Sequence, residues 1–438
     1  MSTNDLLARW STMSFDDIED ELQSGANLGE AERLLGIDQV AELRAQADLP
    51  LAGFGVPEPV VLLPGIMGSL LSSIRGVTSL LWINPAIILK GQSRYLELSA
   101  DGSSDGSPEI HAVASSVEKI FYVRIGIALR KRYTLLEFPY DWRLHIETNG
   151  DLLHQSIERW ADGDPDQQFT LVGHSMGGLV SRAYVARHPE AAKRRIKRII
   201  MHGTPHFGAA GALHDITEGN QIISLAGRLN SNNDLQKLLL NMPSAYQLLP
   251  APPDLVPTTR PYPANWDLYD ADAWRFPGIR QDYLDDARRF HELLADHDHP
   301  VEMIEIAGCH LNTVVDAKRS VDADGRFKLA VIILGKGPDS GDGTVPLWSA
   351  TLPGAQMYYV TGGKHRELSA NKKVVDATLD ILAGKTPDLP SQLPEAPSGI
   401  FGFQAPEEPA EVDVDALRQR LEDGTATAGD LENLYFFG

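Results

Sequence analysis

One short motif constrains the fold of this chain more than any other stretch. Gly173-His174-Ser175-Met176-Gly177 fits the pattern Gly-x-Ser-x-Gly, and the apolar run 169–172 before it predicts a buried strand. Residues 178–187 after it predict a helix. A serine on a sharp turn between strand and helix is typical of a nucleophile elbow, which holds the hydroxyl above the sheet. The alternative is a glycine-rich turn without chemistry.

The rest of the sequence agrees with an α/β-hydrolase fold, in which helices cover both faces of a mostly parallel central sheet. Five apolar runs predict the other main strands, at residues 60–63, 135–138, 196–202, 303–308 and 357–360. Two further runs, 314–315 and 329–334, flank Asp322-Ala323-Asp324-Gly325 and predict a β-ribbon. Between about 209 and 300 the strand pattern stops, so we expect an inserted helical cap.

The pattern divides the chain into a catalytic domain and small appendages. We expect a helical N-terminal appendage at 1–50, the catalytic domain at 51–386, a Pro-rich linker at 387–409 and a C-terminal helical hairpin at 410–438. The hairpin resembles the segment that starts at Ile18 in its spacing of apolar residues and glycine. Each copy is too small to fold alone, so we expect both to be docking elements that could bind a protein partner. The last seven residues also resemble a protease recognition tag, and agreement with the N-terminal repeat favours a native helix.

The net charge and the cysteine content restrict which partners and which cellular location we expect for this protein. The 438 residues carry 39 basic and 60 acidic side chains, a formal net charge of −21. This excess of negative charge argues against nucleic acid or a strongly anionic membrane as the main partner. Cys309 is the only cysteine, so an intrachain disulfide is impossible and we expect a small core residue. The first residues lack a signal-peptide pattern and no apolar run has the length of a membrane span, so the expected location is cytoplasmic.

A serine nucleophile needs a histidine base, and the histidine needs a carboxylate that holds it. In this fold the three residues follow in the order serine, acid, histidine. His365 lies between the last predicted strand and the last predicted helix, so we expect it to be the base. Asp342 is the expected acid, because Gly341 and Gly343 permit a tight turn that presents its carboxylate. Ser175 completes the predicted triad.

Other residues compete for these roles. Asp339 is the local alternative to Asp342, which could also be a purely structural turn residue. Asp316 and Asp322 are better explained as turn or ribbon residues. His310 also follows a predicted strand, but it precedes Asp342 and breaks the expected order, so we expect it in the cap or the pocket.

An oxyanion hole needs two backbone N–H groups. Met176, directly after the nucleophile, offers one, and Ile66, just past a Pro-Gly turn, is the expected second donor, with Met67 as the adjacent alternative. We expect no cofactor and no metal. Asp296-His297-Asp298-His299 offers ligand types, but adjacent residues rarely converge on one ion, which favours a solvated loop.

Six motifs follow one another between about 58 and 385, namely Leu63-Pro64-Gly65-Ile66-Met67-Gly68, Pro139-Tyr140-Asp141-Trp142-Arg143-Leu144, Gly173 to Gly177, Gly203-Thr204-Pro205, Pro243 to Pro250 and Gly341 to Pro346. In type and order they resemble the lecithin:cholesterol acyltransferase and lysosomal phospholipase family. The resemblance implies an α/β-hydrolase that acts on lipid or other acyl esters, with a lid after Gly203-Thr204-Pro205. It implies the same triad, Ser175, Asp342 and His365, and the same oxyanion donors. The chain lacks the cysteines and signal peptide of secreted members, which argues against lipoprotein substrates and a disulfide-closed lid.

The sequence therefore predicts a serine hydrolase that cleaves or transfers acyl esters, with lipid or phospholipid acyl chains as the expected substrate and an acyl-Ser175 intermediate. Leu80-Leu81-Trp82-Ile83 and residues 209–249 are rich in apolar side chains, so we expect them to form the walls and lid of an apolar pocket. Such a lid could contact a membrane surface. The rival hypothesis is an inactive hydrolase fold that serves as a scaffold and binds proteins through its terminal helices.

Overall fold

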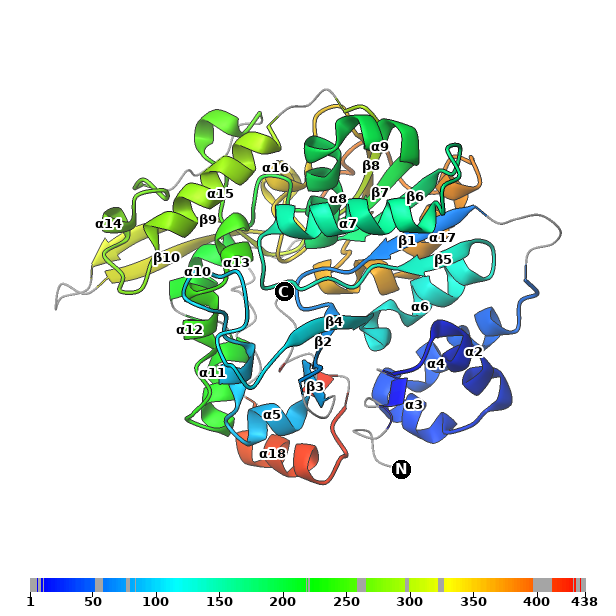
Figure 1. Ribbon diagram of the computed structural model, residues 1–438, viewed down its shortest axis with the longest axis horizontal. Coiled ribbons are helices and arrows are strands. Elements are labelled where there is room, and N and C mark those ends of the chain that lie inside the picture. Colours follow the sequence, from blue (N-terminus) through cyan, green and yellow to red (C-terminus); the bar gives the residue numbers. More distant parts are fainter. Residues whose placement is uncertain are drawn as a thin grey trace.

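The computed structural model describes residues 6, 9–10, 12–51, 58–75, 79–82, 84–217, 219, 221–257, 265–295, 299–321, 327–396, 412–427, 429–430 and 434. Its centre is a six-stranded parallel sheet in the spatial order β11-β8-β7-β6-β1-β5 (Figure 1). The strands are β1 (Pro59–Leu63), β5 (Thr134–Glu137), β6 (Phe169–His174), β7 (Ile196–His202), β8 (Glu302–Cys309) and β11 (Gln356–Thr361). The predicted α/β-hydrolase sheet is confirmed.

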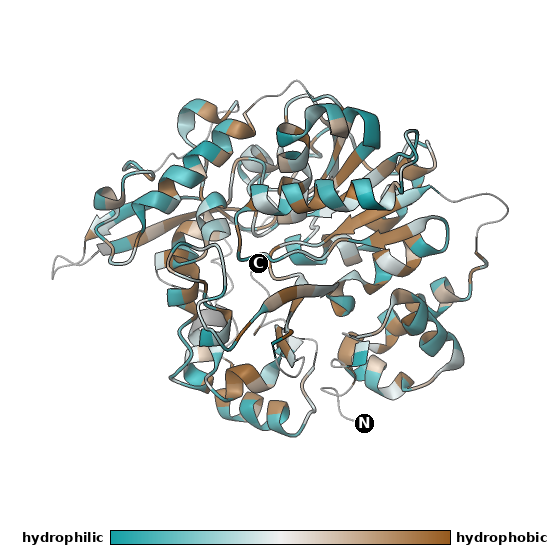
Figure 2. Ribbon diagram, in the orientation of Figure 1, coloured by the Kyte–Doolittle hydropathy of each residue, from teal (hydrophilic) through white to brown (hydrophobic). Residues whose placement is uncertain are grey.

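Helices cover both faces of this sheet, because its strands are apolar on both sides. Val60 and Leu62 pack into one cluster of buried side chains, while Val61 and Leu63 pack into another. The first cluster includes side chains of α6 (Lys119–Arg130) and α17 (Lys372–Leu382), and the second includes α7 (Ile146–Trp160) and α8 (Met176–Arg187). Figure 2 shows the result as hydrophobic strands between helices with a hydrophilic outer face. α9 (Pro189–Arg195) connects α8 to β7.

A second, antiparallel sheet was missed by the sequence analysis. It consists of β2 (Ser69–Ser73), β3 (Ser79–Trp82) and β4 (Ala112–Val117) in the order β3-β2-β4. The sequence predicts that residues 80–83 form part of the wall of an apolar pocket. It assigns no strand to residues 69–73 or 112–117. These strands are short and rich in serine. Strands β2 and β4 pair although they are distant in the chain, Ser69 with Val117 for example. Helices α5 (Pro85–Leu89) and η1 (Ser93–Leu96) follow β3.

In its described part, the segment from 209 to 300 consists of helices joined by loops. Its helices are α10 (Gly211–Thr217), α11 (Gln221–Leu229), α12 (Leu235–Leu240), α13 (Pro243–Gln247), η2 (Pro253–Leu255), α14 (Ala271–Trp274) and α15 (Gln281–Leu293). The predicted ribbon follows as antiparallel strands β9 (Thr313–Val321) and β10 (Phe327–Leu334), which extend along α14 in Figure 1. The turn expected at 322–325 lies outside the described residues.

Both ends of the chain carry helices that pack on the body of the protein. At the N-terminal end, α2 (Phe15–Ser24), α3 (Leu28–Leu35) and α4 (Ile37–Ala47) form a small group, of which α2 and α4 contact α6. Phe15 lies so close to Gly126 that a side chain at position 126 would overlap its ring. At the other end, α18 (Val414–Glu422) contacts α11 and buries Leu417 and Leu421.

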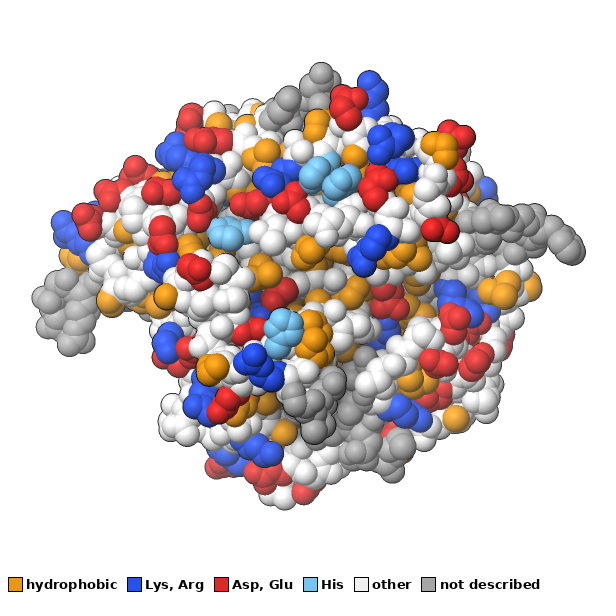
Figure 3. Space-filling view, viewed as in Figure 1, with side chains coloured by type: hydrophobic (Ala, Val, Ile, Leu, Met, Phe, Trp, Pro, Cys, Tyr) orange, Lys and Arg blue, Asp and Glu red, His pale blue; other side chains and the backbone are white. Residues whose placement is uncertain are grey.

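The predicted second helix of the C-terminal hairpin, and residues 397–409 of the predicted linker, lie largely or wholly outside the described residues. Cys309 is fully buried, as expected. Among the described helices, none combines the length and the apolar character that a bilayer span requires. On the face shown in Figure 3, acidic and basic side chains are interspersed over α7, α9 and α15.

Candidate active site

Ser175 occupies a strained turn between β6 and α8. Its backbone angles are φ 52° and ψ −124°, a conformation that residues other than glycine rarely adopt. The turn is tight because α8 approaches the loop after β1. A Cβ atom at Gly177 would lie 2.6 Å from the carbonyl oxygens of Leu63 and Pro64, so only glycine fits there. The Ser175 N–H donates to the carbonyl of His202 at 2.9 Å, which ties the turn to β7.

The structure brings Ser175, His365 and Asp342 together. His365 Nε2 lies 2.9 Å from Ser175 Oγ, and His365 Nδ1 lies 2.7 Å from Asp342 Oδ2. A carboxylate can only accept, so Nδ1 carries the proton and Nε2 is left as the acceptor that faces the serine hydroxyl. All three side chains are nearly buried, between 2% and 6% exposed.

Two loops hold the acid and the histidine. Asp342 lies between η3 (Gly337–Asp339) and α16 (Leu347–Ala350), and its Oδ1 accepts the N–H groups of Thr344 at 3.0 Å and Val345 at 2.7 Å. His365 begins η4 (His365–Ala370), directly after β11, and its N–H donates to the Asp342 carbonyl at 2.9 Å. The two loops therefore fix each other as well as the side chains.

The competing residues lie elsewhere. Asp339 ends η3 and is partly exposed, and Asp316 is buried on β9, where it accepts the N–H of Ala317. His310 lies neither in the cap nor at Ser175, contrary to our expectation: it follows β8, and its Nε2 donates to the carbonyl of Pro394 at 3.0 Å. Asp322 lies outside the described residues.

A small cavity surrounds the serine hydroxyl. It has a volume of about 30 Å³, and its lining residues are Gly65, Ile66, Gly68, Phe121, Tyr122, His174, Ser175, His365 and Arg366. A cavity of this volume holds no more than a few water molecules. Ile66 belongs to the lining, whereas the alternative donor Met67 is absent from it and buries its side chain in the core. Within the described residues, the N–H groups of Ile66 and Met176 donate no hydrogen bond, so both are free to bind an oxyanion.

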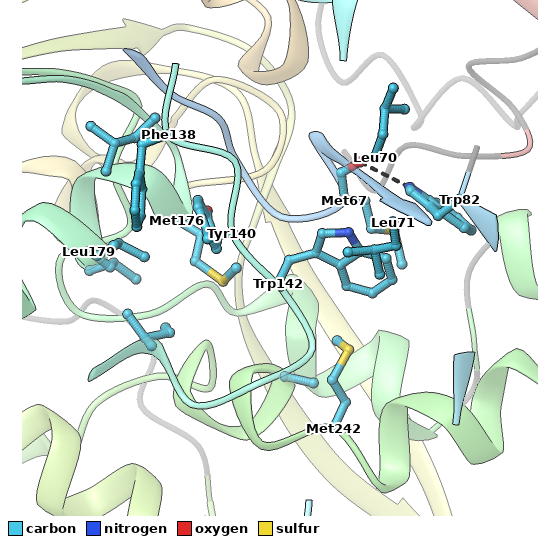
Figure 4. Packing of buried hydrophobic residues seen from close by; sticks show 14 of the residues in the cluster. Met67, Leu70, Leu71, Trp82, Phe138, Tyr140, Trp142, Met176, Leu179 and Met242 are labelled. Carbon is cyan, nitrogen blue, oxygen red and sulfur yellow. Dashed lines mark hydrogen bonds between the residues drawn. The ribbon is translucent and has the colours of Figure 1, made fainter. Parts of the chain in front are cut away.

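Three aromatic side chains hold the loop that contains Ile66 (Figure 4). Trp82 Nε1 donates to the Met67 carbonyl at 2.9 Å, and Tyr140 donates its hydroxyl proton to the Pro64 carbonyl at 2.7 Å. Trp142 Nε1 donates to the Ser69 carbonyl at 3.1 Å, and its ring meets that of Trp82 edge-on. The loop conformation therefore depends on the second sheet and on the segment after β5.

This packing corrects our expectation for the pocket wall. Leu81 and Trp82 are buried and belong to the main hydrophobic cluster. Among the described residues, none from 80–82 or 209–249 lines the cavity at Ser175. Ile83 lies outside the described residues.

A buried chain of hydrogen bonds connects this loop to the histidine loop. His174 Nε2 lies 2.9 Å from the carbonyl of His365, which can only accept, so Nε2 carries the proton. Burial lowers the pKa of His174 to about 3, so its Nδ1 is an acceptor for the Tyr122 hydroxyl at 2.7 Å. Tyr122 in turn accepts the Gly65 N–H at 2.8 Å. The sequence analysis missed Tyr122, since nothing in the helix pattern of residues 119–130 marks one tyrosine as facing the elbow.

A buried acid also lies beside the site and was missed. Glu305 on β8 accepts the Thr204 N–H at 3.2 Å, and its other oxygen lies 3.2 Å from His206 Nε2. Burial raises the pKa of Glu305 well above its ordinary value. A Cβ at Gly203 would lie 2.9 Å from Asp342 Oδ2, so the Gly203-Thr204-Pro205 turn packs directly on the acid of the site.

No group of three or more potential ligand side chains in the described part of the chain is arranged to hold a metal ion. Most of the acidic and histidine-rich stretch, residues 296–298, lies outside that part. His299 Nε2 lies 3.2 Å from the carbonyl of Pro353.

Comparison with known proteins shows which family the chain is similar to. Residues 113–274 match the family model described as Lecithin:cholesterol acyltransferase. The phospholipase A(1) LCAT3 of Arabidopsis thaliana is 28% identical over 137 residues, which cover 29% of this chain and 30% of the relative. The lecithin-cholesterol acyltransferase-like 4 protein of the same plant is 22% identical over 230 residues, or 44% and 43% of the two chains. The alignments thus span less than half the length of these curated relatives. Ser175 lies within the family match, and Asp342 and His365 lie beyond it.

Solved structures support the fold. A chain in the crystal structure of the Tle4-Tli4 complex superimposes with a TM-score of 0.50 at 15% identity, covering 74% of this chain and 98% of that chain. At this identity the likeness concerns the fold alone. The similarity to lecithin:cholesterol acyltransferase-like proteins rests on the family match and the plant relatives.

Proposed function

We propose that this protein is a serine hydrolase or acyltransferase that acts on acyl esters, with Ser175, His365 and Asp342 as its triad. The observation that carries the proposal is the unbroken path of two short contacts from Ser175 Oγ through the imidazole of His365 to Asp342. The strained backbone of Ser175 supports it, because such strain is typical of a nucleophile elbow.

The proposed reaction has two halves. Ser175 Oγ attacks the ester carbonyl carbon while His365 Nε2 takes the hydroxyl proton, and Asp342 stabilises the imidazolium that forms. The N–H groups of Ile66 and Met176 bind the oxygen that becomes negative, an interaction typically worth about 3 kcal/mol for each donor. The carbon–oxygen bond to the alcohol then breaks, the alcohol leaves with the proton from His365, and acyl-Ser175 remains. Water or a second alcohol attacks this ester in the same way and releases the acyl group.

We infer that the acyl group comes from a lipid or a phospholipid. The similarity to a plant phospholipase A(1) supports this substrate class. The cavity at Ser175 has a volume of about 30 Å³, too small for a fatty acyl chain, so we infer that the surrounding walls move to admit a lipid ester. The cap that follows Gly203-Thr204-Pro205 is the proposed lid, and its apolar helices would contact a lipid surface when it opens.

A fluorophosphonate probe tests the nucleophile. Such probes form a covalent bond with an activated serine, so we expect the intact protein to be labelled and Ser175→Ala to remain unlabelled. If neither protein is labelled, or both are labelled equally, Ser175 is not the nucleophile, and the inactive scaffold becomes the better hypothesis. Product analysis with and without an added alcohol then separates hydrolysis from acyl transfer, because only a transferase forms the new ester.

A further inference from the structure

Arg366 lines the cavity of Ser175 and has no role in the proposed triad. It follows His365 directly in η4 and borders the same space as Ser175 and Ile66. A guanidinium keeps its positive charge at all ordinary pH values. Of the residues that line the described cavity, Arg366 carries the one permanent charge. This positive charge lies in a protein whose net charge is −21.

Among the residues that the structure describes, none neutralises the charge of Arg366. Within the described residues, its guanidinium takes part in no hydrogen bond, ion pair or ring contact, although the side chain is partly buried. Lys364, two residues earlier, behaves differently: it is 60% exposed and pairs with Glu367 at 3.0 Å. Partial burial of an arginine costs hydration free energy, and without a partner no hydrogen bond offsets that cost. An anionic ligand would supply such a hydrogen bond.

Space for the rest of such a ligand lies next to Arg366. Phe121 borders the cavity of Ser175 and also a second groove, of about 330 Å³, between the N-terminal helices and η4. Glu367 and Arg124 line this groove as well, and Arg124 is paired with Glu42 at 2.6 Å. Arg366 therefore lines the proposed reaction centre, and its neighbour Glu367 lines a groove that is about ten times larger than the cavity at Ser175.

We propose that Arg366 is a specificity-determining residue, which binds an anionic group on the alcohol part of the ester substrate. A phosphodiester or sulfonate a few atoms from the ester oxygen would accept hydrogen bonds from the guanidinium while the acyl carbonyl lies at Ser175. The inference rests on the proposed function, because it needs an ester bound at Ser175. It adds that this site discriminates between esters by the charge of the alcohol.

The test compares two soluble esters that differ in one anionic group, phenyl butyrate and the butyrate ester of para-hydroxybenzenesulfonate. We expect Arg366→Gln to lower the ratio of kcat/KM for the anionic ester over the neutral ester by about 10- to 100-fold, as loss of a charge-assisted hydrogen bond predicts. Arg366→Lys should retain part of the preference, because the charge remains without the planar fork. Lys364→Gln is the matched control: it removes one positive charge from the same loop and should leave the ratio unchanged.

A second pair, dioctanoylphosphatidylglycerol and dioctanoylglycerol in neutral detergent micelles, extends the test to a lipid phosphate. An equal loss of kcat/KM for both members of each pair in Arg366→Gln would assign Arg366 to the support of the histidine loop and overturn the inference. A ratio that is unchanged in Arg366→Gln would also overturn it. These outcomes are distinct from failure of the proposed function, in which the intact protein would hydrolyse neither ester and bind no fluorophosphonate.

Discussion

The carboxyl edge of the central sheet and the helical cap are held in place by different interactions. At the sheet edge, the backbone ladder sets the positions: His174 pairs with His202, and Val360 pairs with Gly308. The segments that carry Ser175 and His365 follow central strands β6 and β11. Side chains cannot disturb such a ladder easily, because its hydrogen bonds belong to the backbone.

The cap is attached by polar side chains that bond to the backbone of residues 84–147. Asn233 Nδ2 donates to the Ile88 carbonyl at 2.8 Å, and Ser244 Oγ donates to the Trp142 carbonyl at 2.6 Å. Gln247 Oε1 accepts the Ile146 N–H at 2.7 Å. These contacts depend on single residues. We therefore expect substitutions at the sheet edge to change chemistry without unfolding, and substitutions in the cap attachments to change stability.

The largest expected effect is at the sheet edge. Asp342→Asn should lower kcat for a small soluble ester by about 10⁴-fold, because the amide favours the wrong tautomer of His365. The asparagine oxygen can still accept the N–H groups of Thr344 and Val345, so the urea midpoint should hardly change. Steady-state kinetics and urea unfolding of the same preparation measure both quantities. Full activity in this variant would remove Asp342 from the triad.

Acid should destabilise both regions through buried histidines. Burial lowers the pKa of His174 and His202 at the sheet edge to about 3, and that of His291 in the cap to about 4. The unfolded chain binds protons more readily than the folded one, so stability is greatest above the ordinary pKa of 6.5 and falls as the pH drops below it. The expected loss at pH 5 is on the order of 2 kcal/mol for each histidine.

Urea unfolding at pH 7.5 and pH 5.0 measures this loss, and His291→Gln isolates the cap. The glutamine amide can replace the hydrogen bond of His291 to the Leu249 carbonyl but takes up no proton. Its free energy of unfolding should therefore depend less on pH than that of the unchanged protein. An identical pH dependence in both proteins would show that His291 does not contribute.

A smaller effect is expected where the cap is attached. Gln247→Ala should lower the free energy of unfolding by about 1–3 kcal/mol, because it leaves the buried N–H of Ile146 without its acceptor. Gln168→Ala is the matched control: Gln168 is exposed on the loop before β6, so the change should be within about 0.5 kcal/mol. Thermal unfolding of the two variants makes the comparison. Equal stabilities would mean that the cap does not depend on this hydrogen bond.

The smallest effect on catalysis is expected at the C-terminal end. Leu417 and Leu421 of α18 are buried and α18 contacts cap helix α11, while α18 supplies no residue to the cavity of Ser175. Deletion of residues 405–438 should therefore change kcat/KM for a small soluble ester by less than about 3-fold and lower the melting temperature modestly.

The same deletion tests the proposal that the terminal helices bind a partner protein. Pull-downs from the native host with the full chain and with the deletion variant should differ in a specific partner. Loss of small-ester activity in a folded deletion variant would instead make the C-terminal end part of the active site or its lid.

Local sequence signals account for the parts of the structure that were predicted correctly. The elbow at Ser175 is encoded within some twenty residues, since an apolar run, two glycines and a helix pattern adjoin it. The six main strands stand out because parallel strands are apolar on both faces. Asp342 and His365 follow strands in the order that the fold requires, and the structure places their side chains in contact.

Only the tertiary structure decided how distant segments surround these residues. In the sheet of β2, β3 and β4, strand β2 pairs with β4 between residues 39 to 48 positions apart, so no local period reveals that pairing. The contact of Tyr122 depends on how helix α6 packs against the elbow. The contact of Glu305 depends on how strand β8 packs against the turn that contains Thr204. Arg366 lines the cavity of Ser175 for the same reason. Residue type and spacing fix the local chemistry of a chain, but burial and the identity of a neighbour are properties of packing.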